Sequence, residues 1–273
     1  MEKSNMGSLS KRNEDPRELT KVGPEAPPSW LTEYQDDLSI KDLSGHRVLP
    51  RLKIVQAMSS QDLKDQFGEG SIIITPGKGL VCRNKEGFQF VPVFFFSEYV
   101  KWADRRDKIS LMIMEKTFDP TSKLAAKCAN PKYRIESYGN GFEARYAEHL
   151  NFAGFVYGEH PLSGAPAVLC FARGEYATGQ AYISSIHLRR ISSKVAPLWS
   201  GVWEMHPGFR ERGDRRWWGI DFNNPSVPFI QEGEAAFFRE QHVQLKKEFE
   251  DHRLMVDHSD VDEETVDSDS AEL

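Results

Sequence analysis

The alternation of apolar and polar residues predicts that most of the ordered chain is β-structure. In the stretch VLPRLKIVQA, Leu52 and Ile54 fall on one face, and Arg51 and Lys53 fall on the other. A period of two is typical of a half-buried strand. The run FQFVPVFFF at 88–96 is apolar on both faces, so we expect it to be a central strand.

Further apolar runs, separated by turn residues, predict four more strands. Two of them, at 148–157 and 165–171, lie in the middle of the chain. Two others, at 198–205 and 215–222, are separated by the Gly-bearing stretch HPGFRERGD. We expect this last pair to form a hairpin with a long, basic loop at its tip.

Helices are predicted in three places. Ser97 is a suitable N-cap for a short helix that carries Tyr99 and Trp102. A second helix is expected over 177–193. The third, at 232–256, has an apolar stripe with spacings of three and four, made of Ala235, Phe238, His242, Leu245 and Phe249.

Changes in composition divide the chain into four parts. Residues 1–45 are rich in Lys, Glu, Ser and Pro, which predicts a flexible arm. Residues 46–230 hold the predicted strands and are expected to form the folded body, and the C-terminal helix follows at 231–256. Residues 257–273 contain eight carboxylates and no Lys or Arg, which predicts a disordered acidic tail.

The charge is distributed unevenly between these parts. The whole chain has 35 basic and 41 acidic side chains and a formal net charge of −6. Without the tail the balance is 35 to 33, and without the arm as well it is 29 to 24. An acidic tail on a basic, aromatic-rich body is expected to compete with nucleic-acid phosphates for that body and to recruit partners. A tail that only solubilises the protein is the alternative.

Several classes of function are disfavoured. The chain has no run of 18 or more apolar residues and no apolar signal core at its N-terminus, so we expect a cytoplasmic protein that does not enter a membrane. Cys82, Cys128 and Cys170 are too far apart for a disulfide framework or a zinc motif, so no metal or other cofactor is expected. No nucleophile elbow, Walker sequence or HExxH motif is present, so we predict no catalytic residues and no enzyme.

Region 189–222 combines tryptophan with arginine. Trp199 and Trp203 are expected on one strand face, with a glycine between them that leaves room for a flat group. Trp217 and Trp218 are adjacent, so they point to opposite faces of the next strand. Single-stranded nucleic acid requires aromatic faces for its bases and cations for its phosphates. The candidate phosphate contacts interleaved with the tryptophans are Arg189, Arg190, Lys194, Arg210, Arg212, Arg215 and Arg216.

Each of these residues also has a plain structural interpretation. A tryptophan on a strand is more often part of the core, and an Arg-rich loop is often just solvated. Arg51 and Lys53 on the first strand are further candidates for phosphate contact, although charges at such positions are usually solvated surface. The presence of both signals on one hairpin favours the binding interpretation.

Three segments resemble the single-stranded DNA-binding proteins of tailed bacteriophages. They are VLPRLKIVQAMS, EGFQFVPVFFFSEYVKW, and the strand WWGIDF that precedes an aromatic helix. The resemblance implies a mainly β (α+β) fold, with an OB-like five-stranded barrel, inserted strands and a C-terminal helix. It also implies that the tail docks replication proteins such as a polymerase or a helicase, through Asp260, Asp262, Glu263, Glu264, Asp267, Asp269, Glu272 and Leu273.

The chain differs from that family in two respects, one relevant to metal binding and the other to the docking of partner proteins. The chain lacks the Cys-rich inserts of some relatives, which supports leaving metal out, and it ends in Leu273 where many replication tails end in an aromatic residue. We therefore expect a non-catalytic, sequence-tolerant single-stranded DNA-binding protein that acts in phage DNA replication or recombination in the host cytoplasm. Self-association into homo-oligomers is left open. The alternative is a protein-interaction or virion-associated module without DNA affinity, and a nucleic-acid enzyme with a scattered acidic site is a weaker third reading.

Overall fold

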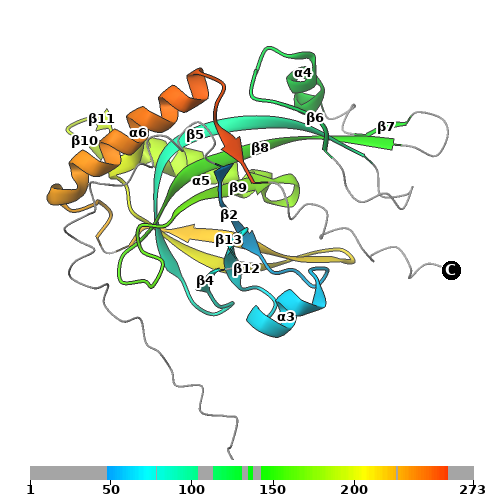
Figure 1. Cartoon of the computed structure of the whole chain (residues 1–273), viewed down its shortest axis with the longest axis horizontal. Coiled ribbons are helices and arrows are strands. Elements are labelled where there is room, and N and C mark those ends of the chain that lie inside the picture. Colours follow the sequence, from blue (N-terminus) through cyan, green and yellow to red (C-terminus); the bar gives the residue numbers. More distant parts are fainter. Residues whose placement is uncertain are drawn as a thin grey trace, which may run out of the picture. The chain divides into compact units, whose positions relative to one another are not determined.

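The fold is organised around two long antiparallel strands, β5 (Phe88–Ala103) and β8 (Glu143–Tyr157) (Figure 1). The structure is a computed structural model, and it describes residues 48–77, 79–103, 113–130, 135–137, 143–225 and 227–257.

These two strands form the middle of a ten-stranded mixed sheet. Its main path runs β13-β12-β5-β8-β9-β2-β3-β4, with β6 paired to β5 and β7 paired to β8. The pair β2–β9 is parallel, and the other pairs of this sheet are antiparallel. The remaining strands of this sheet are β2 (Arg51–Ile54), β3 (Ile72–Thr75), β4 (Gly79–Cys82), β6 (Ile113–Thr117), β7 (Ile135–Ser137), β9 (Pro166–Ala172), β12 (Trp203–Arg212) and β13 (Arg215–Asn223).

Two small sheets accompany the large one. Strands β1 (Val48–Leu49) and β14 (Met255–Val256) pair in parallel, which brings the two ends of the described region together. Strands β10 (Arg190–Ile191) and β11 (Lys194–Val195) form a short antiparallel hairpin.

The central strand predicted at 88–96 is confirmed, but it is longer than expected. The helix predicted after Ser97 is wrong, because β5 continues without a break to Ala103. The Ser97 hydroxyl does not cap a helix; it donates a hydrogen bond of 2.8 Å to Glu148 on the neighbouring strand. Val100 and Trp102 are buried on one face, so the β-branched and aromatic residues here follow the strand period.

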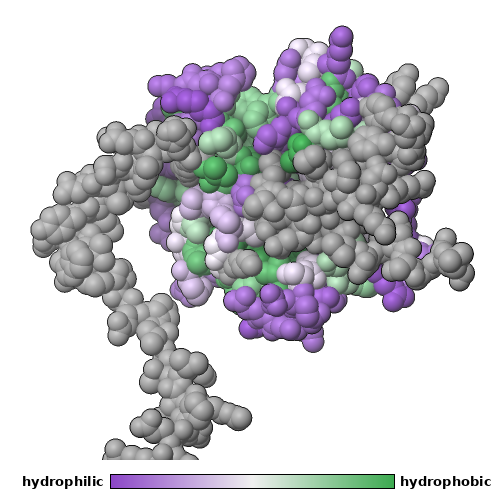
Figure 2. Space-filling view, turned by 45° about the vertical axis from the view of Figure 1, so that its right-hand side comes forward, coloured by the Kyte–Doolittle hydropathy of each residue, from purple (hydrophilic) through white to green (hydrophobic). Residues whose placement is uncertain are grey.

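Each face of the sheet has its own core. Phe90 on β5 and Phe171 on β9 pack with Tyr182 of α5 (Tyr176–Leu188) on one face. Val91 and Val93 pack on the other face against α6 (Ala235–Glu250). Figure 1 shows α6 on one side of the sheet and α3 (Gln61–Phe67) on the other. On the surface, apolar residues show as patches between hydrophilic ones (Figure 2).

The helices confirm two of the three helical predictions. The helix expected over 177–193 ends at Leu188, and the rest of that stretch is the β10–β11 hairpin. Helix α6 buries Phe238 and Leu245, two residues of the predicted apolar stripe. A capping box between Gln231 and Glu234 precedes it, on a 3₁₀ turn. Two further helices, α3 and α4 (Lys123–Ala129), were not predicted.

The hairpin predicted from 198–205 and 215–222 exists as β12–β13, with different boundaries. The chain makes a 3₁₀ turn at Leu198–Ser200, and the strand begins only at Trp203. The stretch predicted as a long basic loop is strand up to Arg212, which pairs with Arg215 across a two-residue turn. Gly213 in that turn has a φ of 60°, which glycine adopts without strain.

The predicted fold class is confirmed at the coarse level: the described chain is mainly β, with one large mixed sheet and a few helices. The pairing does not confirm an OB-like barrel, because the end strands β13 and β4 do not pair with each other in the described residues. None of the helices in this part of the chain has the length and apolarity needed to cross a bilayer.

The close approach of β5 and β8 requires a glycine at position 154. A Cβ there would lie 2.3 Å from the Val91 carbonyl oxygen and 2.6 Å from the Phe90 ring. We expect Gly154→Ala to lower the free energy of unfolding by about 1–3 kcal/mol, because the crowded atoms include backbone. Urea unfolding followed by circular dichroism measures the change. Gly233→Ala is the matched control, since a Cβ there meets nothing within 4 Å; equal stability of both variants would contradict the argument.

Candidate nucleic-acid interface

Trp203 is part of the core, so the prediction that it stacks on a nucleic-acid base is wrong for this structure. Its side chain is 1% exposed, and its ring lies 4.8 Å from Tyr182 in an edge-on contact. The guanidinium of Arg189 covers the ring at 3.7 Å from its centroid. No face of this indole is available to a base.

Arg189 is a structural cation, which corrects its prediction as a phosphate contact. It donates hydrogen bonds to the carbonyl oxygens of Pro228 (2.6 Å) and Val202 (2.7 Å) and to the Asn224 side chain (2.8 Å). Burial lowers the pKa of its guanidinium from the usual value. The three acceptors tie the end of α5 to the start of β12 and to the segment after β13.

The room for a flat group that we expect over Gly201, between Trp199 and Trp203, is also filled. A Cβ on Gly201 would lie 2.8 Å from a guanidinium nitrogen of Arg189. Trp199 itself belongs to the 3₁₀ turn and packs against the α6 core on the other face of the sheet. The two tryptophans therefore do not share a face.

Trp217 and Arg210 are held by acids on one face of the β12–β13 hairpin. The Trp217 indole donates to Glu175 at 2.9 Å. Arg210 pairs with the same carboxylate at 3.3 Å and with Asp221 at 2.6 Å, and the hydrogen bond to Asp221 is the main cause of its raised pKa. Gly219 is needed because a Cβ there would lie 2.3 Å from Glu175. This network positions the hairpin and leaves Arg210 neutralised.

Trp218 points to the opposite face, as its adjacency to Trp217 predicts. Its ring makes an edge-on contact with Phe209 at 5.2 Å between centroids. The side-chain amide of Gln56 bonds both the backbone N–H and the carbonyl of Trp218, each at 2.8 Å. Trp218 is half-buried, while Phe209 is exposed. Together they form the one aromatic pair of this hairpin that stays open to solvent within the described residues.

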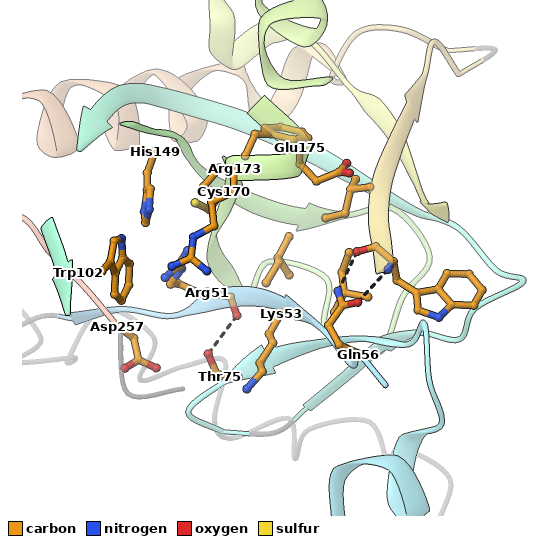
Figure 3. A pocket seen from close by; sticks show the side chains of 16 residues that line it. Arg51, Lys53, Gln56, Thr75, Trp102, His149, Cys170, Arg173, Glu175 and Asp257 are labelled. Carbon is orange, nitrogen blue, oxygen red and sulfur yellow. Dashed lines mark hydrogen bonds between the residues drawn. The ribbon is translucent and has the colours of Figure 1, made fainter. Parts of the chain in front are cut away.

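A groove of about 220 Å³ runs along β2, and Trp218 is one of its lining residues (Figure 3). Three cationic side chains line it: Arg51 and Lys53 from β2, and Arg173 from the turn after β9. Its other lining residues are Leu52, Ile54, Gln56, Thr75, Trp102, His149, Cys170, Phe171, Ala172, Glu175, Ile220 and Asp257. The predicted secondary candidates Arg51 and Lys53 are thus brought together, with a third cation that the sequence did not single out.

The inner wall of the groove fixes Arg173. This residue has a φ of 51°, an unusual value for a side chain with a Cβ, and its guanidinium lies 5.1 Å from the Trp102 ring. The same indole stacks on His149 at 5.8 Å. His149 in turn lies 3.9 Å from the buried Glu98 carboxylate. The cation is thus held against an aromatic ring that is itself packed.

The other predicted basic residues lie outside the groove lining. Arg190 and Lys194 sit on the β10–β11 hairpin, and Arg212, Arg215 and Arg216 sit at the tip of β12–β13. Arg216 pairs with Glu211 at 3.1 Å on the exposed tip. The tail residues predicted to dock partners, from Asp260 to Leu273, lie outside the described residues. The first tail residue, Asp257, is described and lines the groove.

Sequence reasoning missed Arg173, Gln56, Phe209 and the position of Trp102. Phe209 was predicted to lie in a loop, so its pairing with Trp218 could not be inferred. Arg173 and Gln56 reach the groove through the parallel pairing of β2 with β9 and through contacts across 162 residues, for which no local pattern exists. Trp102 was assigned to a helix that does not form.

The three thiols differ in exposure. Burial raises the pKa of Cys82 to about 12 and also raises that of Cys128, while Cys170 is half-buried in the groove wall. Within the described ranges, no group of three or more His, Cys, Asp or Glu side chains has a metal-binding arrangement.

The chain with this mainly β fold belongs to a bacteriophage protein family. Residues 25–247 match the model of a family described as Pam3 phage gp34-like protein, and the chain is a member of that family. No curated protein and no solved structure is significantly similar to this chain.

Two adjacent arginines provide a test of these assignments. We expect Arg189→Ala to lower the free energy of unfolding by about 2 kcal/mol or more, because it removes the hydrogen bonds to the Val202 and Pro228 carbonyls and uncovers the buried Trp203 ring. Arg190→Ala should stay within about 0.5 kcal/mol of wild type, since its side chain is exposed. Urea unfolding of the two variants checks this, and a mild Arg189→Ala variant would refute the structural role.

Proposed function

We propose that this phage protein binds single-stranded DNA without sequence preference, in the groove along β2 and on the adjoining face of the β12–β13 hairpin. The observation that carries the proposal is the position of Trp218. It lines the same groove as Arg51, Lys53 and Arg173, and it also forms the open aromatic pair with Phe209.

The arrangement suits a single strand for two physical reasons. Cations fixed in a groove attract the phosphate backbone and release its counterions. Aromatic faces hold unpaired bases, at about 1–3 kcal/mol per base, and every base has such a face. The groove has a volume of about 220 Å³, and we propose that it takes the backbone of a short segment of the strand.

The proposal includes the biological setting and the finer fold. Membership of a phage family supports an origin in bacteriophage, and we propose a role in phage DNA replication or recombination. The mainly β sheet is compatible with an OB-like barrel, which stays part of the proposal. The acidic tail is proposed to modulate binding and to dock replication proteins.

Neutralising the groove cations should weaken binding of oligo-dT. Arg51→Gln and Arg173→Gln are each expected to lower affinity several-fold, because one phosphate contact is lost. Each should also reduce the salt slope of log K by about 0.7, the contribution of one cation on a single strand. Tryptophan fluorescence titrations at several salt concentrations measure both quantities.

The matched control is Arg239→Gln, which removes an exposed charge on α6, outside the groove lining. Its affinity and salt slope should equal those of wild type. Absence of any salt-dependent quenching in wild type would reject DNA binding and favour the protein-interaction module. Binding that all three variants retain would instead move the site elsewhere.

Labelling of Cys170 tests directly whether the bound DNA lies in the groove. Native labelling with iodoacetamide at pH 8 should modify Cys170 first, because burial raises the pKa of Cys82 and Cys128 and lowers their thiolate fraction. Saturating oligo-dT should slow the labelling of Cys170, which lines the groove. Unchanged labelling in a complex that clearly forms would place the DNA outside the groove.

Removal of residues 258–273 should raise the affinity for oligo-dT, most strongly at low salt. The tail leaves the body at Asp257, in the groove lining, and the deleted residues carry seven of its eight carboxylates. Their negative field repels DNA phosphates over roughly a Debye length, about 10 Å at 0.1 M salt. Titrations at 20 mM and 300 mM salt test this, and an affinity that truncation leaves unchanged at low salt would remove the tail's electrostatic role.

A further inference from the structure

The hairpin β10–β11 and the end of α5 form an exposed apolar surface that the proposed DNA groove does not use. Leu188 is 77% exposed, Ile191 is 47% exposed and Val195 is 41% exposed. We call residues 188–195 the serine hairpin, after the Ser192-Ser193 pair at its turn. It lies at the upper left of Figure 1.

The register of the serine hairpin gives both of its faces the same composition. Arg190 pairs with Val195 on one face, and Ile191 pairs with Lys194 on the other. All four side chains are exposed. Each face therefore offers one cation beside one aliphatic group, and the segment contains no acidic residue.

The hairpin has a fixed shape although it buries little. Ser192 and Ser193 have φ values of 47° and 70°, as a tight two-residue hairpin turn requires, although Asn and Gly adopt them more readily. At its base, Ala196 donates a backbone hydrogen bond of 2.9 Å to Arg189, which is itself anchored. An isolated two-stranded hairpin is marginal in water. A strained, exposed hairpin with aliphatic residues on both faces is typical of a surface that something else covers.

The composition of this surface selects the kind of segment that fits it. An occupant needs carboxylates for Arg190 and Lys194, and aliphatic side chains for the exposed apolar groups. The C-terminal segment 258–273 has both: seven carboxylates, no Lys or Arg, and the aliphatic residues Val261, Val266 and Leu273. A DNA strand supplies phosphates and flat bases but no aliphatic side chains, so it matches the cations of this surface better than its aliphatic groups.

The C-terminal segment 258–273 is also long enough to reach the serine hairpin. Sixteen residues follow Asp257, and at about 3.3 Å per residue they span roughly 50 Å when extended. A domain of this size has a radius of gyration of about 17 Å, so a segment of this length reaches over a large part of the surface around Asp257. A tethered segment also docks at a high effective concentration, in the millimolar range for a short linker.

We propose that the end of the acidic tail, around Val266 and Leu273, docks on the serine hairpin of its own chain. The aliphatic residues of the tail lie against Leu188, Ile191 and Val195, and its carboxylates pair with Arg190 and Lys194. This docking stands independently of DNA binding, and it gives Leu273 the apolar anchoring role that its terminal position suggests.

The test follows the tail signals in the full-length protein by NMR, with ¹⁵N labelling and methyl labelling of Val and Leu. In wild type, the Val266 and Leu273 signals should be displaced from random-coil positions. In the double variant Arg190→Glu, Lys194→Glu they should return to random coil, because the hairpin then repels the tail. Tail signals at random-coil positions in wild type, or tail signals that this variant leaves unchanged, would overturn the proposal.

Two further variants separate the possible explanations. Arg212→Glu with Arg215→Glu makes the same charge change on the other hairpin and should leave the tail signals as in wild type. If it frees the tail instead, the tail lies on the proposed DNA surface and the proposal fails. Ile191→Ser with Val195→Ser keeps the charge and should also release the tail, whereas retention would reduce the contact to unspecific electrostatics and overturn it.

Dilution of the protein and titration with oligo-dT complete the experiment. Displacement that disappears on dilution would assign the tail to a second copy and overturn docking within one chain. Oligo-dT affinity of the Arg190→Glu, Lys194→Glu variant is measured separately at 300 mM salt, where the field of the tail is screened. Loss of tail docking with DNA binding retained would support the hairpin assignment, and absence of DNA binding in wild type would reject the proposed function alone.

Discussion

The antiparallel pairing of β5 with β8 is the interaction on which the rest of the structure depends. Both faces of β5 are buried, so a slip of one residue would exchange its two apolar sets between the cores. The close contact at Gly154 and the irregularity between Pro92 and Phe94 give this pairing a specific register. The same register brings Glu98 opposite His149, and with it one wall of the groove.

Two charged side chains, Arg189 and Glu175, have a structural role that the sequence does not reveal. Arg189 sits under the start of β12 with three acceptors, and Glu175 holds Trp217 and Arg210 on the hairpin. Burial of a guanidinium is costly unless it donates hydrogen bonds to nearby acceptors, and Arg189 has three within 2.6–2.8 Å. Glu175 and Arg173 belong to one short turn, so a single turn orients the hairpin and supplies a cation to the groove.

The sequence predicts the parts of this fold that local patterns encode. The run at 88–96 and the apolar stripe of α6 are both specified by periodicity, and both appear where expected. The helix after Ser97 fails because a good N-cap cannot outweigh fourteen cross-strand pairs between β5 and β8. Trp203 fails as a contact for a related reason: burial depends on what covers a strand, and α5 and Arg189 cover this one. The groove could be predicted only in part, since Arg51 and Lys53 share a strand face, while Arg173 arrives by a long-range parallel pairing.

The basic residues of the molecule occur in two different physical settings. In the groove, Arg173 is stacked on Trp102, and Lys53 is buried, so little side-chain freedom remains to be lost when an anion binds. On the serine hairpin, Arg190 and Lys194 are exposed and lie beside aliphatic groups that are exposed to water. A phosphate backbone gains most from the first setting, because fixed cations act on it without being ordered first. A segment that alternates acids with Val and Leu gains most from the second, because only there do its apolar side chains leave water. The two proposed anionic ligands thus differ in the apolar neighbours that their cations require, and not in charge alone.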